Sequence, residues 1–417
     1  MISTFEEQER QDPEQRENTL MSRLPALIEA ALNTTGWAEI LQGTDPAQIG
    51  TREALQALPI TNKLDLARLQ SQHPPLGGLY AASLPQLQRI FMSPGPIFEA
   101  QGRSNDWWRT ARPLRALGLE PGHIVQNCFS YHLTPGAFLI DEGARALGCT
   151  VLPAGPGQTE QQVNAMASLN VDAYAGTPSF LKIIVTRAQE LGRDIGSLKK
   201  ALVSAEALPA SLRQWLRSNG VTRVLQFYGT ADIGAIAYET ADENDDAYPG
   251  LILNEDLILE IVDPATGQSV PDGQLGEIVI TSLNPLYPLV RFGTGDLSSI
   301  LPGRSPCQRT NVRITGWQGR VDQLVKVRGM FIHPADVASV TQRHALIQKV
   351  QLVVERASGN DTLTLHCLVP DATEISEQTR TAIATTFREL TRLRADIQFV
   401  PTLPKDAPTI KDMRSLE

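Results

Sequence analysis

A short segment near the middle of the chain combines glycine with side chains suited to ligand chemistry. Tyr228, Gly229 and Thr230 follow an apolar run, and Asp232 comes two residues later. A hard cation such as Mg²⁺ takes carboxylates of this kind, usually with water in its shell. An ordinary turn, with Gly229 for geometry and Asp232 as a helix cap, would show the same residues.

A second segment, residues 291–297, carries Asp296 directly after two glycines. Gly293 and Gly295 would let the backbone come close to a ligand. A carboxylate is an acceptor with several lone pairs, so Asp296 could receive more than one hydrogen bond from a ligand. A tight β-turn that carries a solvated acid is the alternative.

Three more segments complete an ordered set along the chain. The five segments, at sensible spacing, are residues 203–209, 226–234, 291–297, 319–329 and 331–334. Together they resemble the phenylacetate–coenzyme A ligase branch of the adenylate-forming enzymes. Any one segment alone is a weak signal, but the ordered set is a strong indication of the fold. The similarity extends loosely from the N-terminal helices to near the C-terminus.

The resemblance implies a role for each residue of the first two segments. Tyr228 would lie near adenine, and Thr230 would offer its hydroxyl to the phosphate beside Gly229. Asp232 would be a catalytic residue that helps to hold Mg²⁺, although relatives carry the longer glutamate there. Asp296 would accept hydrogen bonds from both ribose hydroxyls of ATP or AMP.

Two loops of the central region would line the substrates. The resemblance places one loop against the adenine and the carboxylate substrate, and it places the acyl pocket at another. A lone histidine in such a loop is more often structural than catalytic, so no acid–base role is expected for it. The nucleotide loop is Ser204, Ala205 and Glu206, and the acyl-pocket candidates are Tyr131, His132 and Gly136.

Residues 319–329 resemble the hinge between a large and a small domain. Asp322 would be the pivot, Arg320 would lie near the ribose or phosphates, and Gly329 would line the coenzyme A tunnel. A charged segment bounded by glycines suits a hinge, because hinges absorb backbone changes at a few residues. A plain interdomain linker is the alternative.

Residues 90–102 depart from the family pattern at the place of its phosphate-binding loop. Relatives wrap the outer phosphates of ATP with backbone N–H groups, hydroxyls and a lysine. Here Ser93 and Gly95 remain as phosphate-binding candidates, but prolines on both sides of Gly95 remove two N–H donors. The lysine is absent, and Glu99 adds negative charge where it would repel a polyphosphate.

The C-terminal tail departs as well. Relatives end in a Gly-Lys whose ammonium stabilises charge in the adenylation transition state. The glycine is missing here, and Lys411 is the close candidate for the catalytic lysine. It lies one or two residues from the expected place, and a one-residue shift turns a strand side chain to the opposite face.

The elements that must position these residues follow a recognisable order. The first 85 residues show helical spacing, and apolar β-branched runs then alternate with amphipathic segments up to residue 230. This alternation predicts an α/β fold with a mainly parallel, helix-covered sheet. Residues 257–263 and 276–282 predict an antiparallel pair. We expect a large N-terminal domain, residues 1–318, with a β-rich part at about 250–318. A small α+β domain, residues 319–417, would follow it.

Composition narrows the class of protein. The chain has 417 residues, of which 42% are apolar and 20% charged, with a net charge of −9. This charge argues against bulk attraction to nucleic acid or to an anionic membrane. The N-terminus lacks a secretory signal, and no apolar run approaches the ~20 residues that span a bilayer. Four scattered cysteines indicate reduced thiols and no zinc site, so a cytoplasmic location is expected.

Three functions remain open. The leading one is an AMP-forming ligase that uses ATP and Mg²⁺ to activate a carboxylic acid, aromatic and phenylacetate-like, and passes the acyl group to coenzyme A. The altered loop and tail motivate the second, a non-catalytic homologue that binds AMP or acyl-CoA. The third is an adenylating enzyme with a different acceptor. A homodimer is suggested by the resemblance alone.

Overall fold

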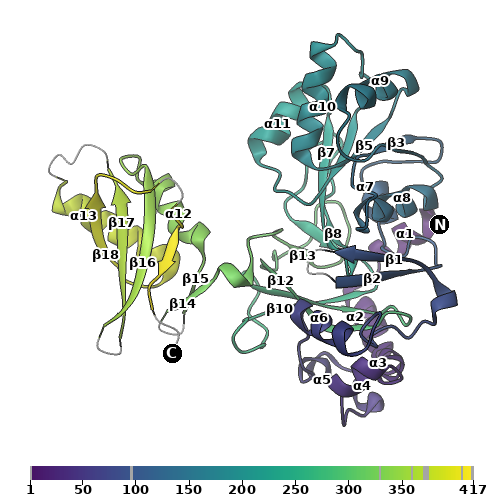
Figure 1. Cartoon of the computed structure of the whole chain (residues 1–417), viewed down its shortest axis with the longest axis horizontal. Helices are drawn as coiled ribbons and strands as arrows, with labels where there is room; N and C mark the ends of the chain where they lie inside the picture. Colours follow the sequence, from purple (N-terminus) through teal and green to yellow (C-terminus); the bar gives the residue numbers. More distant parts are fainter. Residues whose placement is uncertain are drawn as a thin grey trace. The chain divides into compact units, whose positions relative to one another are not determined.

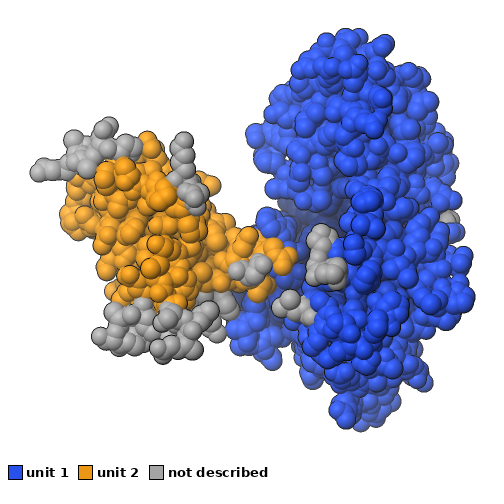
Figure 2. All heavy atoms as spheres, in the orientation of Figure 1, with its two compact units in different colours: residues 1–318 blue, residues 319–417 orange. Residues whose placement is uncertain are grey.

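The chain folds into two compact units. The computed structural model describes residues 2–93, 97–327, 330–357, 360–369, 375–404 and 407–414. One unit is Met1–Gln318 and the other is Gly319–Glu417, and Figure 2 shows them in blue and orange. Each unit has a hydrophobic core of its own.

The large unit is built on an eight-stranded sheet with the order β13-β9-β8-β7-β6-β5-β3-β4. Strands β4, β3, β5, β6 and β7 run parallel, and β8, β9 and β13 continue the sheet antiparallel. The α/β class predicted from the alternating pattern is confirmed. The strands are β3 Ile124–Asn127, β4 Thr150–Pro153, β5 Ala173–Gly176, β6 Lys200–Val203, β7 Arg223–Thr230, β8 Gly234–Tyr238, β9 Leu251–Leu253 and β13 Arg313–Ile314.

Helices cover both faces of the parallel part (Figure 1), because side chains alternate along each strand. Ala173 and Leu202 pack against α7 and α8, whereas Tyr174 and Ala201 pack against α9, α10 and α11. The loops after the strands therefore meet at the carboxyl edge, where such sheets bind ligands. The helices are α7 Ala111–Ala116, α8 Gly136–Ala146, α9 Thr159–Leu169, α10 Pro178–Glu190 and α11 Ala210–Ser218.

A second, antiparallel sheet consists of β10 Leu257–Val262, β11 Gly276–Ser282 and β12 Leu289–Ser298. The predicted pairing of residues 257–263 with 276–282 is confirmed, with Leu257 opposite Ser282. Its apolar side chains share one core with the N-terminal helices. The N-terminal helices are α1 Ile2–Glu9, α2 Pro13–Ser22, α3 Leu24–Leu32, α4 Thr35–Ile40, α5 Arg52–Gln56 and α6 Lys63–Gln72, with the short 3₁₀ turns η1 Pro46–Gln48 and η2 Leu84–Gln86. Helices α2 to α6 contribute the side chains of this core.

Two segments differ from the sequence-based expectation. At the place of the family's phosphate-binding loop, β1 Leu87–Ser93 and β2 Ile97–Gly102 are paired antiparallel strands. Residues 106–119 form one of the amphipathic segments that predict a helix, and the helix there begins only at Ala111. Asp106 and Arg109 have left-handed backbone angles, with φ of 52° and 60°, and the Asp106 carboxylate accepts a hydrogen bond from the Ala111 N–H at 3.0 Å. The first turn is therefore replaced by a side-chain-capped loop.

A buried ion pair joins β12 to β10. Arg291 is 3% exposed and binds Glu260 through two hydrogen bonds, Nη2 to Oε1 at 2.9 Å and Nε to Oε2 at 3.1 Å. Its remaining N–H groups donate to the backbone carbonyls of Gln56, Leu58 and Gly267. All five guanidinium donors are thus satisfied, which is what allows a charge to be buried at this position.

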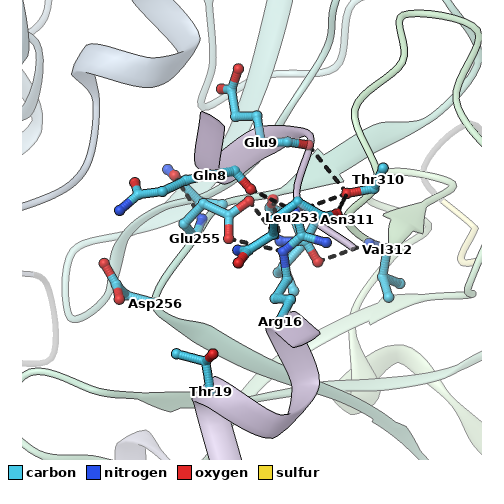
Figure 3. A network of polar contacts seen from close by, with 12 residues as sticks. Gln8, Glu9, Arg16, Thr19, Leu253, Glu255, Asp256, Thr310, Asn311 and Val312 are labelled. Atoms are coloured by element: carbon cyan, nitrogen blue, oxygen red, sulfur yellow. Dashed lines mark hydrogen bonds and ion pairs between the residues drawn. The ribbon is translucent and has the colours of Figure 1, made fainter. Parts of the chain in front are cut away.

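A second buried network holds the N-terminal helices against the β-rich part (Figure 3). Arg16 of α2 donates from Nε to Glu255 at 3.0 Å, and from Nη2 to the carbonyl of Gln8 and the hydroxyl of Thr310. Glu9 accepts hydrogen bonds from the Tyr238 hydroxyl at 2.6 Å and Arg309 Nε at 2.9 Å. Segments more than 200 residues apart are therefore bound together by charges that water does not reach.

The small unit is an α+β fold with its own sheet of order β18-β17-β16-β19. Leu352 of β16 and Leu365 of β17 pack against Val337, Ile383 and Phe387 of its two helices. The elements are η3 Val321–Gln323, β14 Val325–Val327, β15 Met330–Ile332, α12 Pro334–Arg343, β16 Lys349–Ala357, β17 Asn360–Leu368, α13 Glu377–Thr391, β18 Asp396–Val400 and β19 Ile410–Asp412. In neither unit does a described helix have the length and apolar character needed to cross a membrane.

Replacing Arg291 by Met should lower the free energy of unfolding of the large unit by about 3–5 kcal/mol, because Glu260 is left as an unpaired buried charge. Urea denaturation measures this. The double variant R291M/E260M should lose less than the sum of the two single changes. Arg187→Met is the matched control, because that arginine pairs with exposed acids on the surface and should cost less than about 1 kcal/mol. A loss in R291M no larger than in R187M would contradict the assignment.

Candidate functional site

The carboxylate of Asp296, on β12, is held by two aromatic side chains. The Tyr228 hydroxyl donates to Oδ2 at 2.8 Å, and the Trp317 indole N–H donates to Oδ1 at 3.1 Å. The backbone N–H of Asp296 donates to the Thr294 hydroxyl at 3.1 Å. A carboxylate offers about four acceptor sites, which suits Asp296 to a ligand with paired hydroxyls as well as to fixed donors.

The turn between β7 and β8 carries the rest of that segment. Gly229 lies at a bulge in the pairing, and a Cβ there would approach the Gly234 carbonyl oxygen to 2.4 Å, so the position requires glycine. The Thr230 hydroxyl accepts a hydrogen bond from the Ile233 N–H at 3.2 Å. Asp232 caps no helix, because strand β8 follows directly. The ordinary explanation of Asp232 as a helix cap is therefore wrong.

Asp232 is buried and faces one cation. Its side chain is 0% exposed, and Lys63 Nζ lies 3.1 Å from Oδ2, with the Lys63 side chain 37% exposed. Apart from this ion pair, neither oxygen of Asp232 has a hydrogen-bond partner within the described part of the chain. Buried carboxylates normally have their lone pairs occupied, so this arrangement is what a site for a hard cation or a polar ligand offers.

The position of Lys63 follows from a pairing that joins the N-terminal region to β12. Thr61 forms a parallel bridge with Phe292, and its N–H and carbonyl bond to Arg291 and Gly293 at 3.1 and 2.7 Å. Helix α6 begins two residues later, so its first residue emerges beside the carboxyl edge of the large sheet. The buried Arg291 thus helps to position both Asp296 and Lys63.

Glu99 of β2 belongs to the same buried region. It is 2% exposed, and neither carboxylate oxygen makes a hydrogen bond of ordinary geometry with the described residues. Burial raises the pKa of Glu99 to about 7, and the charge of Asp232 adds to the rise. Ser93 and the Lys63 ammonium partly oppose it. Tyr80 and Tyr287 stack 3.9 Å apart in this region, and their pKa values are raised by burial and by the fields of both acids.

Ser93 is the buried last residue of β1, directly before the hairpin tip. Gly95, the other phosphate-binding candidate, lies outside the described residues. The hairpin does not turn the negative charge of Glu99 outward to solvent. It directs the carboxylate into the region that contains Lys63 and Asp232.

The loop after β6 has an unusual backbone. Ala205 is exposed and has a φ of +68°, which an alanine rarely adopts. Ser204 next to it donates from its hydroxyl to the Phe227 carbonyl at 2.8 Å, and exposed Glu206 accepts from the Ser179 N–H at 3.4 Å. A strained residue held on both sides at the carboxyl edge of a sheet is typical of functional loops.

One acyl-pocket candidate, Tyr131, lies against a group of aromatic side chains. Tyr131 contacts Phe138 edge to face at 5.3 Å, and its hydroxyl accepts from Asn127 Nδ2 at 2.9 Å. Phe138 also packs against Phe91, which in turn contacts Trp108. Gly136 begins helix α8, whereas the side chain of His132 is exposed.

In the small unit, the structure places the remaining candidates on its N-terminal segment and on an edge strand. Arg320 precedes the turn η3 that contains Asp322, and Gly329 lies outside the described residues. Gly319 has a φ of +128°, and a Cβ there would meet the His333 ring at 2.0 Å, so this position requires glycine. Lys411 lies on β19, paired with Val353 of β16, and its side chain is exposed.

Two residues of this region were missed by the sequence analysis. Lys63 lies more than 160 residues from Asp232, and only the bridge between Thr61 and Phe292 brings it there. Trp317 lies beside a recognised segment, and a tryptophan between two glycines at that place was the available signal for a ligand contact. In the structure its side chain is 52% exposed.

Comparison with known proteins agrees with this geometry. A family model described as AMP-binding enzyme matches residues 142–285. A phenylacetate–coenzyme A ligase of Pseudomonas putida is 31% identical over 337 residues, which cover 78% of this chain and 74% of that one. The phenylacetate–coenzyme A ligase of Thermus thermophilus is 29% identical over the same shares.

A solved structure shows the same fold over nearly the whole chain. It is an open conformation of 2-hydroxyisobutyryl-CoA ligase in complex with 2-HIB-AMP and CoA, with a TM-score of 0.85 and 23% identity, covering 97% of this chain and 93% of that one. The chain belongs to the family of AMP-binding, adenylate-forming enzymes, among which phenylacetate–coenzyme A ligases are its relatives. The resemblance drawn from the five motifs is thus confirmed.

Replacing Asp296 by Asn should weaken AMP binding by about tenfold to a hundredfold, because hydrogen bonds to a charged acceptor contribute about 1.5–3 kcal/mol. Calorimetric titration with AMP measures the change. The variant should also lose discrimination between AMP and its 2′-deoxy analogue. Asp272→Asn, at an exposed turn of the same unit, is the control and should bind AMP as the unchanged protein does. Equal AMP affinity in D296N and D272N would exclude Asp296 from the ribose site.

Proposed function

We propose that this protein is an AMP-forming acid–coenzyme A ligase. A carboxylate oxygen of the acid attacks the α-phosphorus of ATP, the bond to pyrophosphate breaks, and an acyl-adenylate forms. The sulfur of coenzyme A then attacks the acyl carbon, AMP leaves, and the thiol proton is released. The carrying observation is that the end of β7 and the turn after it hold two contacts to distant segments: Tyr228 donates to Asp296 of β12, and Asp232 pairs with Lys63 of α6.

The large unit supplies residues for the nucleotide. Asp296 would orient the ribose hydroxyls, with Tyr228 and Trp317 holding the carboxylate in place. Gly229, Thr230 and the loop Ser204–Glu206 would line the adenine and α-phosphate. Asp232 fits a metal ligand because, apart from the Lys63 ammonium, its buried oxygens have no hydrogen-bond partner among the described residues. Mg²⁺ held there would neutralise phosphate charge, which is the main requirement of in-line phosphoryl chemistry.

The proposed acid is aromatic and phenylacetate-like. The support is the group of Tyr131, Phe138, Phe91 and Trp108, whose rings favour edge contacts with an aryl substrate. The Pseudomonas putida relative is named for phenylacetate, and the structural neighbour for the aliphatic 2-hydroxyisobutyrate. Both kinds of acid therefore belong in the substrate panel.

The small unit is proposed to act as the mobile part. Asp322 would be the pivot, Arg320 would approach the ribose or phosphates, Gly329 would line the coenzyme A path, and Lys411 would stabilise the adenylation transition state. Lys411 is suited to this because it is exposed on a short edge strand and its long side chain can reach a ligand.

Purified protein with Mg²⁺, ATP, coenzyme A and a panel of aryl and short-chain acids should release pyrophosphate and form a thioester. Arylacetates should give the highest kcat/KM. No pyrophosphate with any acid, together with tight AMP binding, would support the second candidate, a non-catalytic AMP-binding homologue. The hairpin that stands in place of a phosphate loop favours that candidate. Pyrophosphate release without a thioester would indicate another acceptor.

Lys411→Ala should lower the rate of pyrophosphate release by about 10²–10³-fold, because one preorganised electrostatic contact to a transition state is removed. AMP affinity should not change. Thioester formation from presupplied acyl-adenylate and coenzyme A should also persist, since that step does not use the adenylation lysine. Lys182→Ala on helix α10, which lies over Trp215, is the control for removing a surface cation. If K411A and K182A release pyrophosphate equally fast, Lys411 has no catalytic role.

A further inference from the structure

Two buried carboxylates and one ammonium share a region with few compensating donors. Glu99 is 2% exposed and Asp232 is 4% exposed. Apart from the Lys63 contact to Asp232 and a Ser93 contact to Glu99, their carboxylate oxygens lack hydrogen-bond partners in the described residues. Lys63 is the ammonium, 3.1 Å from Asp232. With all three groups ionised the region carries one excess negative charge, and burying an uncompensated charge costs several kcal/mol.

The backbone around Glu99 is held in place by side-chain hydrogen bonds on both sides. The residue before it, Phe98, has its N–H and carbonyl bound by the Gln70 side chain at 2.8 and 2.7 Å. The residue after it, Ala100, has its N–H and carbonyl bound by the Tyr80 hydroxyl at 2.6 and 3.2 Å. Side chains from α6 and from the loop after it thus fix the backbone on both sides of Glu99, as preorganised sites require.

The Lys63 ammonium is placed so that it can move away from Asp232 toward solvent. Its side chain is 37% exposed, whereas that of Asp232 is fully buried. A lysine carries its charge on a flexible four-carbon stem, so the ammonium can move toward solvent without disturbing the backbone. The ion pair therefore compensates Asp232 when no other cation is present and need not persist when one enters.

We propose that Glu99 and Asp232 together form a divalent-cation site, and that Lys63 is the counter-ion displaced when the cation enters. This inference rests on the proposed function, which places Mg²⁺ at Asp232, and it adds Glu99 as the second carboxylate. Mg²⁺ is commonly held by one or two carboxylates, with water and substrate phosphates completing its six oxygens.

The site also accounts for the altered segment 90–102. An acid near the outer phosphates of ATP would repel them, but a divalent cation shared by two carboxylates neutralises both acids, and its open coordination positions can take phosphate oxygens. A metal ion held by Glu99 and Asp232 would therefore take the place of the lysine that relatives carry in the phosphate loop. Polyphosphate would be attracted through the cation, not through the loop.

Titration of Mn²⁺ into the full-length protein, followed by electron paramagnetic resonance, tests the proposal without an activity assay. Glu99→Gln should weaken Mn²⁺ binding by at least about tenfold, the smaller loss seen when even an outer partner of a metal is removed. Lys63→Met should tighten binding, because the competing ammonium is gone. Glu190→Gln, on the surface of α10, is the matched control and should bind as the unchanged protein does.

Thermal melting with and without Mg²⁺ provides the second readout. E99Q should melt at the same or a higher temperature than the unchanged protein without metal, since it removes a buried charge, and should lose most of the Mg²⁺-dependent rise. Unchanged Mn²⁺ affinity in E99Q, with a loss in Asp232→Asn, would overturn the role of Glu99 and leave the proposed function intact. Unchanged affinity in both would overturn this site and the placement of Mg²⁺ at Asp232. Weaker binding in K63M would overturn the counter-ion role.

Discussion

The ion pair between Arg291 and Glu260 organises the large unit at the place where its parts meet. It holds β12 against β10, and its remaining donors bind carbonyls of the segment that follows α5. The backbone of Arg291 then accepts the N–H of Thr61, which places the start of α6. One charged side chain therefore determines where Asp296 and Lys63 lie relative to each other, although it touches neither of them.

A buried charge of this kind is tolerated because every donor has an acceptor, and the candidate site shows the contrast. Asp232 and Glu99 are as deeply buried as Arg291, yet their oxygens lack that saturation. The same unit thus contains both a satisfied and an unsatisfied set of buried charges. The satisfied charges of Arg291 and Glu260 stabilise the fold. The unsatisfied carboxylates of Asp232 and Glu99 remain able to bind a ligand in a low-dielectric environment, where electrostatic interactions are strongest.

The sequence predicted much of the fold because its signals are local. Residues 159–169 and 178–192 show helical spacing, and α9 and α10 form there; the short apolar runs became β3 to β7. Strands β8 and β12 were not predicted, because β8 is short and begins at Gly234, and β12 is interrupted by two glycines and by charged residues. The helix expected from residue 106 was shortened by left-handed residues that no periodicity reveals.

The sequence predicted only part of the candidate site. Tyr228, Asp232 and Asp296 belong to motifs with a characteristic order, so they could be named before any coordinates. Lys63 could not, because its proximity to Asp232 depends on a bridge between Thr61 and Phe292. The inward orientation of Glu99 could not either, because it depends on the register of a two-stranded hairpin whose edge is held by Gln70 and Tyr80.

The hydrogen bond between Trp317 and Asp296 couples the fluorescence of one tryptophan to the proposed ribose site. Of the five tryptophans, Trp37, Trp107 and Trp108 are buried in the core, whereas the Trp317 indole is 52% exposed and bonded to the proposed ribose acceptor. Indole emission responds to solvent and to a neighbouring carboxylate. Occupation of the ribose site would therefore change the intrinsic fluorescence of one residue against a nearly constant background, so that nucleotide occupancy could be followed in real time without a label.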